Sequence, residues 1–150
     1  MLRTSRRCPR VHSPGLDLSR ALAAATDAAL AAGELVRAEF HRPSGPRGSG
    51  GDAPVEEEAE SLIRARLGED FPGVRWRGDE TQGELEWLVD PNGGTRAFLQ
   101  GHRGSSVSVA LVRRGVPVLG VVFAPLAPDD RGDLFTWHEG GVLRRNGRPV

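Results

Sequence analysis

The stretch that decides the fold is residues 87–98, which read Trp-Leu-Val-Asp-Pro-Asn-Gly-Gly-Thr-Arg-Ala-Phe. The apolar triplet Trp87–Val89 is typical of a buried strand, and Asp90 follows it directly. The proline after this carboxylate fixes a turn. The small residues Gly94 and Thr95 then let backbone N–H groups approach an anionic oxygen closely. The stretch therefore predicts a strand that ends at a site for a metal ion and a phosphate group.

Apolar spacing on either side of this strand predicts the remaining elements. Between Asp17 and Phe40 the apolar residues recur every three or four positions, as on one face of a helix. A second helix is expected from about Val55 to Glu69, where a Phe-Pro-Gly sequence ends it. Strands are expected at 74–77, 85–89, 105–113, 116–124 and 134–137. Helices followed by an antiparallel meander predict an α+β fold, with two N-terminal helices packed on an antiparallel or mixed sheet.

The composition narrows the function classes. The chain has 150 residues, which suits one domain, and its 20 basic residues balance 20 acidic ones. No global field therefore attracts nucleic acid or an anionic membrane, so we expect neither as a partner. Every basic residue is Arg, which excludes a lysine nucleophile and a Walker-type phosphate loop. The single cysteine, Cys8, gives no disulfide framework, and we expect a cytoplasmic protein.

The first 15 residues have a different character from the rest. They carry four arginines and no acid, and they lack the apolar segment of a secretory signal. We interpret residues 1–15 as a disordered basic tail, and residues 16–150 as the folded part. An organelle transit peptide and a start codon assigned too early are the alternatives.

The segment at 87–98 resembles the signature of the inositol monophosphatase family, magnesium-dependent phosphatases that include bisphosphate nucleotidase-like members. That signature reads Trp, an apolar residue, Val or Ile, Asp, Pro, a variable residue, Asp, Gly and Thr, and here Gly93 replaces its second Asp. The resemblance runs from about Leu18 to the end of the chain. It implies the first half of the layered αβαβα sugar-phosphatase fold, with the C-terminal half absent.

The resemblance assigns roles to the matching positions, with Mg²⁺ as the cofactor. Asp79, in Gly-Asp-Glu, takes the place of a metal-binding Glu, while Asp90 takes the place of an aspartate that bridges two metal ions. The carbonyl of Asn92 would be a further metal ligand. Gly94 and Thr95 would bind the substrate phosphate. Hard oxygen ligands of this kind are those that Mg²⁺ prefers.

A catalytic pair is implied as well. Asp52, ahead of the second helix, resembles the family's aspartate that hydrogen-bonds the signature threonine, so that Asp52 and Thr95 would orient the attacking water. The alternative is that Asp52 only caps the second helix. Glu80 is the alternative ligand beside Asp79, and both of these acids also fit an exposed acidic turn.

The expected function is hydrolysis of a small phosphate monoester, such as an inositol phosphate, a nucleotide bisphosphate or a sugar phosphate. Gly93 removes a metal ligand, and the family's last metal-binding aspartate lies beyond Val150, so we expect impaired or absent activity in this chain. One alternative is a degenerate, non-catalytic member that binds phosphate or a partner chain. Another is an unrelated α+β binding module. The resemblance is also compatible with a homodimer.

Overall fold

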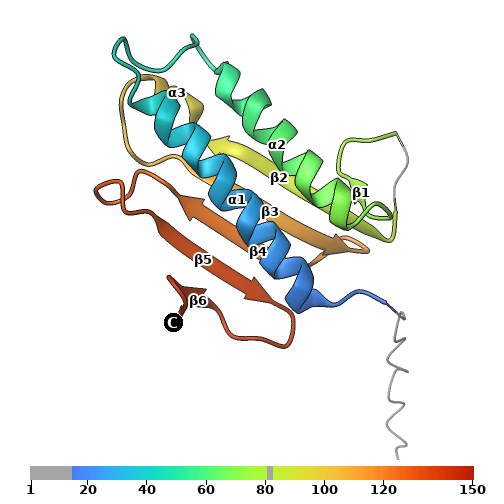
Figure 1. Ribbon diagram of the computed structural model, residues 1–150. Coiled ribbons are helices and arrows are strands. Elements are labelled where there is room, and N and C mark those ends of the chain that lie inside the picture. The colour runs from blue at the N-terminus through green and yellow to red at the C-terminus, as the bar shows by residue number, and fades with distance from the viewer. Residues whose placement is uncertain (1–14, 81–82) are drawn as a thin grey trace, which may run out of the picture.

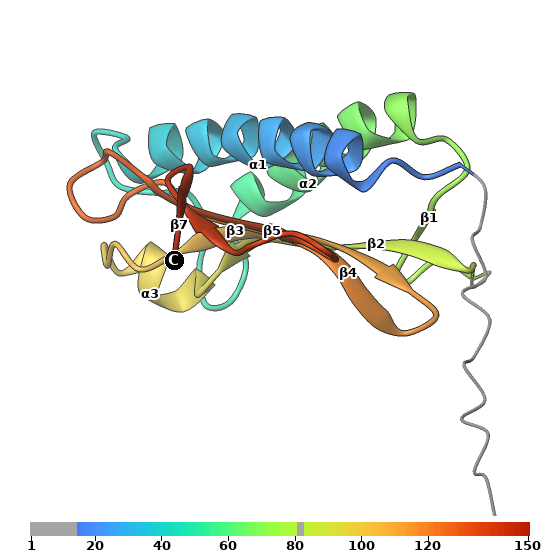
Figure 2. The same cartoon turned by 90° about the horizontal axis from the view of Figure 1, so that it is seen from below.

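The computed structural model describes residues 15–80 and 83–150, which form one mixed sheet with two long helices on the same face (Figures 1 and 2). Of the basic tail expected at residues 1–15, only Gly15 belongs to the described residues, and residues 1–14 lie outside them. The strands are β1 (Arg75–Trp76), β2 (Leu85–Gly93), β3 (Ser106–Arg113), β4 (Val116–Ala124), β5 (Asp133–His138), β6 (Arg144–Arg145) and β7 (Arg148–Pro149). They lie in chain order, with β1 parallel to β2 and every later pair antiparallel. The expected fold class is confirmed.

The first helix, α1 (Leu18–Phe40), packs on the middle of the sheet. Its start is capped by Asp17, whose side chain accepts from the backbone N–H groups of Ser19 and Arg20. Five of its eight buried residues are alanine and a sixth is Gly33, so the helix approaches β3 and β4 closely. At Gly33 the approach is so close that an added Cβ would lie 2.4 Å from the ring of Phe123.

The second helix, α2 (Pro54–Asp70), lies beside α1 and above β2. Ala53 is its N-cap residue, with Pro54 in the first helical position, where a missing N–H costs nothing. One face is buried at helical spacing by Val55, Ala59, Ile63 and Leu67. The helix ends before Phe71 because Pro72 disfavours the helical conformation of the residue ahead of it.

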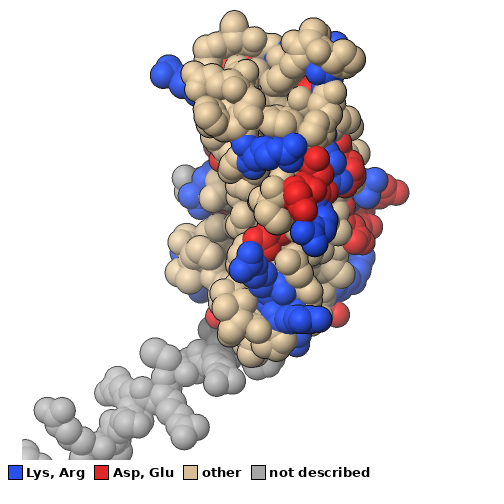
Figure 3. All heavy atoms as spheres, turned by 90° about the vertical axis from the view of Figure 1, so that its left-hand side faces the viewer, with Lys and Arg blue, Asp and Glu red and all other residues tan. Residues whose placement is uncertain are grey.

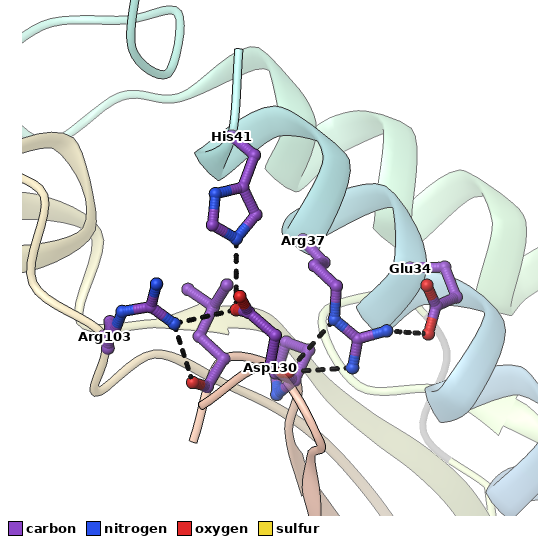
Figure 4. A network of polar contacts seen from close by, with 7 residues as sticks. Glu34, Arg37, His41, Arg103 and Asp130 are labelled. Carbon is purple, nitrogen blue, oxygen red and sulfur yellow. Dashed lines mark hydrogen bonds and ion pairs between the residues drawn. The ribbon is translucent and has the colours of Figure 1, made fainter. Parts of the chain in front are cut away.

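Polar contacts fasten the loop between β4 and β5 to α1 (Figure 4). The carboxylate of Asp130 lies 3.1 Å from Nε2 of His41 and accepts from Nη1 of Arg103 at 2.8 Å. Arg37 donates to the carbonyl oxygen of Pro125 at 2.8 Å. The hydrogen bonds from His41 and then Arg103 lower the pKa of Asp130 below its ordinary value. The end of α1, the segment after β2 and the β4–β5 loop are therefore held together.

Alternation along the strands gives the sheet two different faces. The face under the helices contains buried residues such as Trp87 and Leu111, whereas Leu88 on the opposite face is 42% exposed. Pairing places Leu88, Ala110, Gly120 and Trp137 side by side in one row across four strands on this opposite face. We call this the bare face. Neither α1 nor α2 covers it (Figure 2).

The surface shows no concentration of one charge sign on the side drawn in Figure 3, where acidic and basic side chains are interspersed. Within the described ranges, no helix is both long and apolar enough to span a membrane. The structure also contains elements that the spacing analysis did not anticipate: the short helix α3 (Thr95–Leu99), the short strands β6 and β7, and the extension of β2 to Gly93.

Candidate functional site

The carboxylate of Asp90 stands at the end of the regular part of β2. Its register with β3 is regular up to Asp90 and then shifts before Gly93, because Pro91 has no N–H to donate to the sheet. The backbone N–H of Asn92 instead donates to Oδ1 of Asp90 at 3.2 Å. Asp90 is exposed. The local sequence thus turns a paired strand into an open end with a fixed carboxylate.

Gly94 makes the turn from this strand into α3. Its φ of +89° lies in the left-handed region, where a side chain would be strained. The backbone N–H of Phe98 donates to the carbonyl oxygen of Gly94 at 3.0 Å, and the Phe98 ring is fully buried. The buried ring therefore anchors the short helix and holds Thr95 at its first position.

Thr95 pairs with α2. Its hydroxyl donates to Oε1 of Glu56 and also lies 3.4 Å from the carbonyl oxygen of Asn92. Glu56 belongs to the first turn of α2, 39 positions earlier in the chain. The described hydrogen bonds include none between Thr95 and Asp52, so the partner of the threonine differs from the one expected. The physical reason is that the first turn of α2, not the loop before it, reaches the threonine.

A cleft of about 610 Å³ lies between the start of α2 and the end of β2. The segment Pro91–Gly94 and Thr95 line it, and none of the lining residues in the described part of the chain is basic. Five acidic residues also line it: Asp52, Glu56, Glu57, Glu60 and Asp90. This acidic lining favours a cation. A bare phosphate would be repelled from it.

Asp52 lies in this cleft, at the end of a tight turn. Its backbone N–H and carbonyl groups exchange hydrogen bonds with Ser49, at 3.1 and 3.0 Å. Gly48 closes the turn with a φ of +125°, and an added Cβ there would lie 2.3 Å from the carbonyl oxygen of Asp52. Ala53, and not Asp52, is the N-cap residue of α2. The helix-cap alternative is therefore wrong.

Asp79 does not line the cleft. It follows β1 and borders a separate hollow beside Arg77, Glu86 and Arg114. Its Oδ1 lies 3.8 Å from Nη1 of Arg64, an α2 residue. Of the three predicted metal-binding residues, the structure thus brings Asp90 and Asn92 together and leaves Asp79 outside the cleft.

The donor set agrees with magnesium in kind but not in number. Carboxylate and carbonyl oxygens line the cleft, as Mg²⁺ prefers. Over residues 15–80 and 83–150, however, no three His, Cys, Asp or Glu side chains are grouped closely enough to hold a metal ion. The described side chains therefore do not complete a magnesium site by themselves.

Gly93 explains part of this shortfall. An added Cβ at Gly93 would lie 3.4 Å from Oδ2 of Asp90 and 3.5 Å from Oγ of Ser106, both ordinary contacts. A Cβ therefore fits at this position, next to the carboxylate of Asp90. The missing carboxylate is a property of the sequence and not a steric requirement of the fold.

The sequence pattern indicates no separate role for Glu56. It stands in a run of acids at 56–58, and such a run ordinarily complements the positive end of a helix. Nothing in the local pattern separates Glu56 from its neighbours. Only the packing of α2 against the end of β2 selects it as the partner of Thr95.

A helix-covered sheet with a carboxylate-lined cleft at the end of β2 is an arrangement suited to cation-assisted binding of phosphate groups. The sequence model of the Inositol monophosphatase family matches residues 17–149. The chain belongs to this family.

Three known proteins illustrate the similarity. The chain is 33% identical to inositol monophosphatase 1 from Solanum lycopersicum over 145 residues, covering 89% of this chain and 52% of the tomato protein. It is 38% identical to histidinol-phosphatase from Mycobacterium tuberculosis over 76 residues, covering 47% of this chain and 29% of that protein. The solved inositol monophosphatase from Anabaena superposes with a TM-score of 0.72 at 26% identity, over 89% of this chain and 47% of that one. The chain spans about half the length of the tomato protein and about half the length of the Anabaena protein.

Proposed function

We propose that this chain supplies the N-terminal part of a magnesium-dependent phosphate monoester hydrolase, and that its cation binding and turnover are impaired by Gly93. The observation that supports the proposal is the cleft itself, where Asp90, Asn92, Gly94 and Thr95 of the signature meet the acids of α2. Family membership gives the reaction class.

The charge of the cleft couples the binding of cation and substrate. The acidic lining repels a phosphate group until a cation neutralises it, so cation and substrate enter the cleft as partners. Gly94 and Thr95 then offer backbone N–H groups that the first turn of α3 leaves without intrahelical partners. When bound, the cation supplies charge neutralisation on the phosphate and a more acidic water.

The threonine prepares the position of the attacking water. Because the hydroxyl proton of Thr95 is directed to Glu56, its oxygen lone pairs remain available to accept a hydrogen bond from a water molecule in the cleft. Asp52, which lines the same cleft, stays a prediction as a second member of this arrangement. We add Glu56 to the proposed catalytic set as the residue that orients Thr95.

The substrate class follows from the relatives and stays broad. The tomato relative is named for inositol monophosphate and the Mycobacterium relative for histidinol phosphate. Both are small phosphorylated molecules, and we propose a substrate of that size. A cytoplasmic location, a homodimer and the lack of a nucleic-acid or membrane partner also stay predictions.

Restoring the missing carboxylate tests the proposal. Gly93→Asp places a second carboxylate beside Asp90, so we expect Mg²⁺ to bind on the order of tenfold more tightly than to the unaltered chain. Isothermal titration calorimetry with Mg²⁺ measures the affinity, and release of phosphate from p-nitrophenyl phosphate measures turnover. Gly104→Asp is the control, because Gly104 is exposed and an added Cβ there meets nothing within 4 Å.

The outcomes separate the candidate functions. Tighter Mg²⁺ binding together with new turnover in Gly93→Asp alone supports an impaired phosphatase. Tighter binding without turnover favours the non-catalytic, phosphate-binding alternative, for which the replacement of the signature carboxylate by Gly93 is the specific observation. Equal affinities in Gly93→Asp and Gly104→Asp would contradict a cation site at Asp90.

A further inference from the structure

One arginine of α2 connects the cleft with Asp79. Nε of Arg64 donates to Oε1 of Glu60 at 3.0 Å, and Nη1 of the same guanidinium lies 3.8 Å from Oδ1 of Asp79. Glu60 lines the cleft, whereas Asp79 does not. A single guanidinium thus lies between a carboxylate of the cleft and the carboxylate that the family resemblance predicts to be a metal ligand.

Trp76 contacts both Arg64 and Asp79. Cζ of Arg64 lies 4.8 Å from the centroid of the Trp76 ring, a cation–π contact. The backbone N–H of Asp79 donates to the carbonyl oxygen of Trp76 at 3.2 Å and closes the turn after β1. Trp76 itself is paired with Trp87 in the parallel ladder of β1 and β2. Arg64 and Asp79 are therefore both positioned by a residue of the sheet.

We propose that Arg64 is a built-in counter-ion for Asp79, which occupies that carboxylate in place of a divalent cation. The inference rests on the proposed function, since it concerns the cation site of that function. The guanidinium is part of the chain itself, so Asp79 has this cationic partner whether or not a metal ion is present. This accounts for the failure of Asp79 to join the cleft, and it predicts that Arg64 weakens cation binding.

We expect a modest effect on cation affinity because the Arg64–Asp79 ion pair is exposed to solvent. The side chain of Arg64 is 38% exposed and that of Asp79 is 45% exposed. Exposed ion pairs contribute little free energy, so the release of Asp79 should tighten divalent cation binding by about two- to fivefold. The direction and the dependence on Asp79 matter more than the size.

Arg64→Gln is the test variant and Arg66→Gln is its control. Arg66 lies on the same helix, is exposed, and has no ion pair among the described residues, so the control removes the same charge without touching Asp79. Isothermal titration calorimetry with Mg²⁺, repeated with Mn²⁺, measures the affinities at fixed ionic strength. We expect Arg64→Gln to bind both ions about two- to fivefold more tightly, and Arg66→Gln to bind them like the unaltered chain.

A second substitution tests whether the effect of Arg64→Gln depends on Asp79. Asp79→Asn should return the affinity of Arg64→Gln to that of the unaltered chain, while Asp79→Asn alone should change it little. Equal gains in Arg64→Gln and Arg66→Gln would overturn the inference, as would a gain that survives the loss of Asp79 or no saturable binding in any variant. Circular dichroism confirms that the variants fold.

The failure of the proposed function is a different result. Cation affinities that follow these expectations, combined with no phosphate binding or hydrolysis in Gly93→Asp, would overturn the phosphatase function. Such a result would leave the role of Arg64 standing.

Discussion

Asn92 is a buried side chain without hydrogen-bond partners. It is 2% exposed, and neither Nδ2 nor Oδ1 has a partner in the described structure, although its backbone groups are used by Asp90 and Thr95. A buried amide without partners costs folding free energy, because it has lost its bonds to water. The residue that begins the Asn-Gly-Gly-Thr turn is therefore costly to stability through its side chain and useful to the site through its backbone.

We expect Asn92→Leu to stabilise the chain by about 1 to 3 kcal/mol. Leucine has a similar branched shape and no polar atoms, and the backbone carbonyl at position 92 remains in place. Chemical denaturation measures the free energy of unfolding. Ser105→Ala, which removes another buried and unpartnered oxygen, is the companion variant. A loss of stability in Asn92→Leu would show that the amide is satisfied in solution.

The loop between α1 and α2 is held by one buried carboxylate. Glu39, at the end of α1, is 5% exposed and accepts from the backbone N–H and the guanidinium of Arg47. Arg47 also donates to Glu58 of α2 at 2.9 Å. We call the contacts among Glu39, Arg47 and Glu58 the clasp, and they join both helices to the loop that carries Asp52. Asp52 of this loop lines the cleft.

Acid should open this clasp. The hydrogen bonds from Arg47 lower the pKa of Glu39 below its ordinary value of 4.5. The ionised carboxylate therefore stabilises the fold at pH values above 4.5. This stabilisation is lost as the pH falls below 4.5 and through the lowered pKa. We expect Glu39→Gln to destabilise the chain by about 1 to 3 kcal/mol at pH 7. The difference from the unaltered chain should shrink as the pH falls from 5 toward 3. Thermal unfolding across this range measures it, and a constant difference would contradict the role of the ionised carboxylate.

The molecule as a whole has one covered and one bare sheet face. Both long helices lie on the covered face (Figure 2), while Leu88 and Val122 on the bare face are 42% and 41% exposed. Asp90 belongs to the same alternating set of β2 as Leu88, so the proposed cation site lies where the bare face meets the cleft. The exposed apolar surface and the site are therefore continuous.

The bare face should bind an apolar dye. We expect the fluorescence of anilinonaphthalene sulfonate with the folded chain to fall when Leu88 and Val122 are both replaced by Thr. Val116 and Val142 are more exposed, at 62% and 57%, and lie outside this face, so their replacement by Thr is the control. If the control lowers the signal as much as the test variant does, the bare face is not the dye site.

Periodicity and turn chemistry were sufficient to predict both long helices, the five principal strands and the class of fold. These features depend on local sequence patterns, such as the spacing of small apolar residues along α1 or the Pro72 that follows α2. The cleft lining at Asp90, Gly94 and Thr95 was also foreseeable, because a strand end and a glycine turn are local events.

Only the tertiary structure decided the partners of these residues. Thr95 bonds to Glu56, 39 positions away, since α2 crosses the end of β2 at its first turn. Asp79 is beside Arg64 instead of Asp90, because the turn after β1 and the position of Trp76 direct it there. Spacing along the chain fixes which atoms are neighbours within an element. The packing between elements fixes which carboxylate meets a hydroxyl, a guanidinium or a cation.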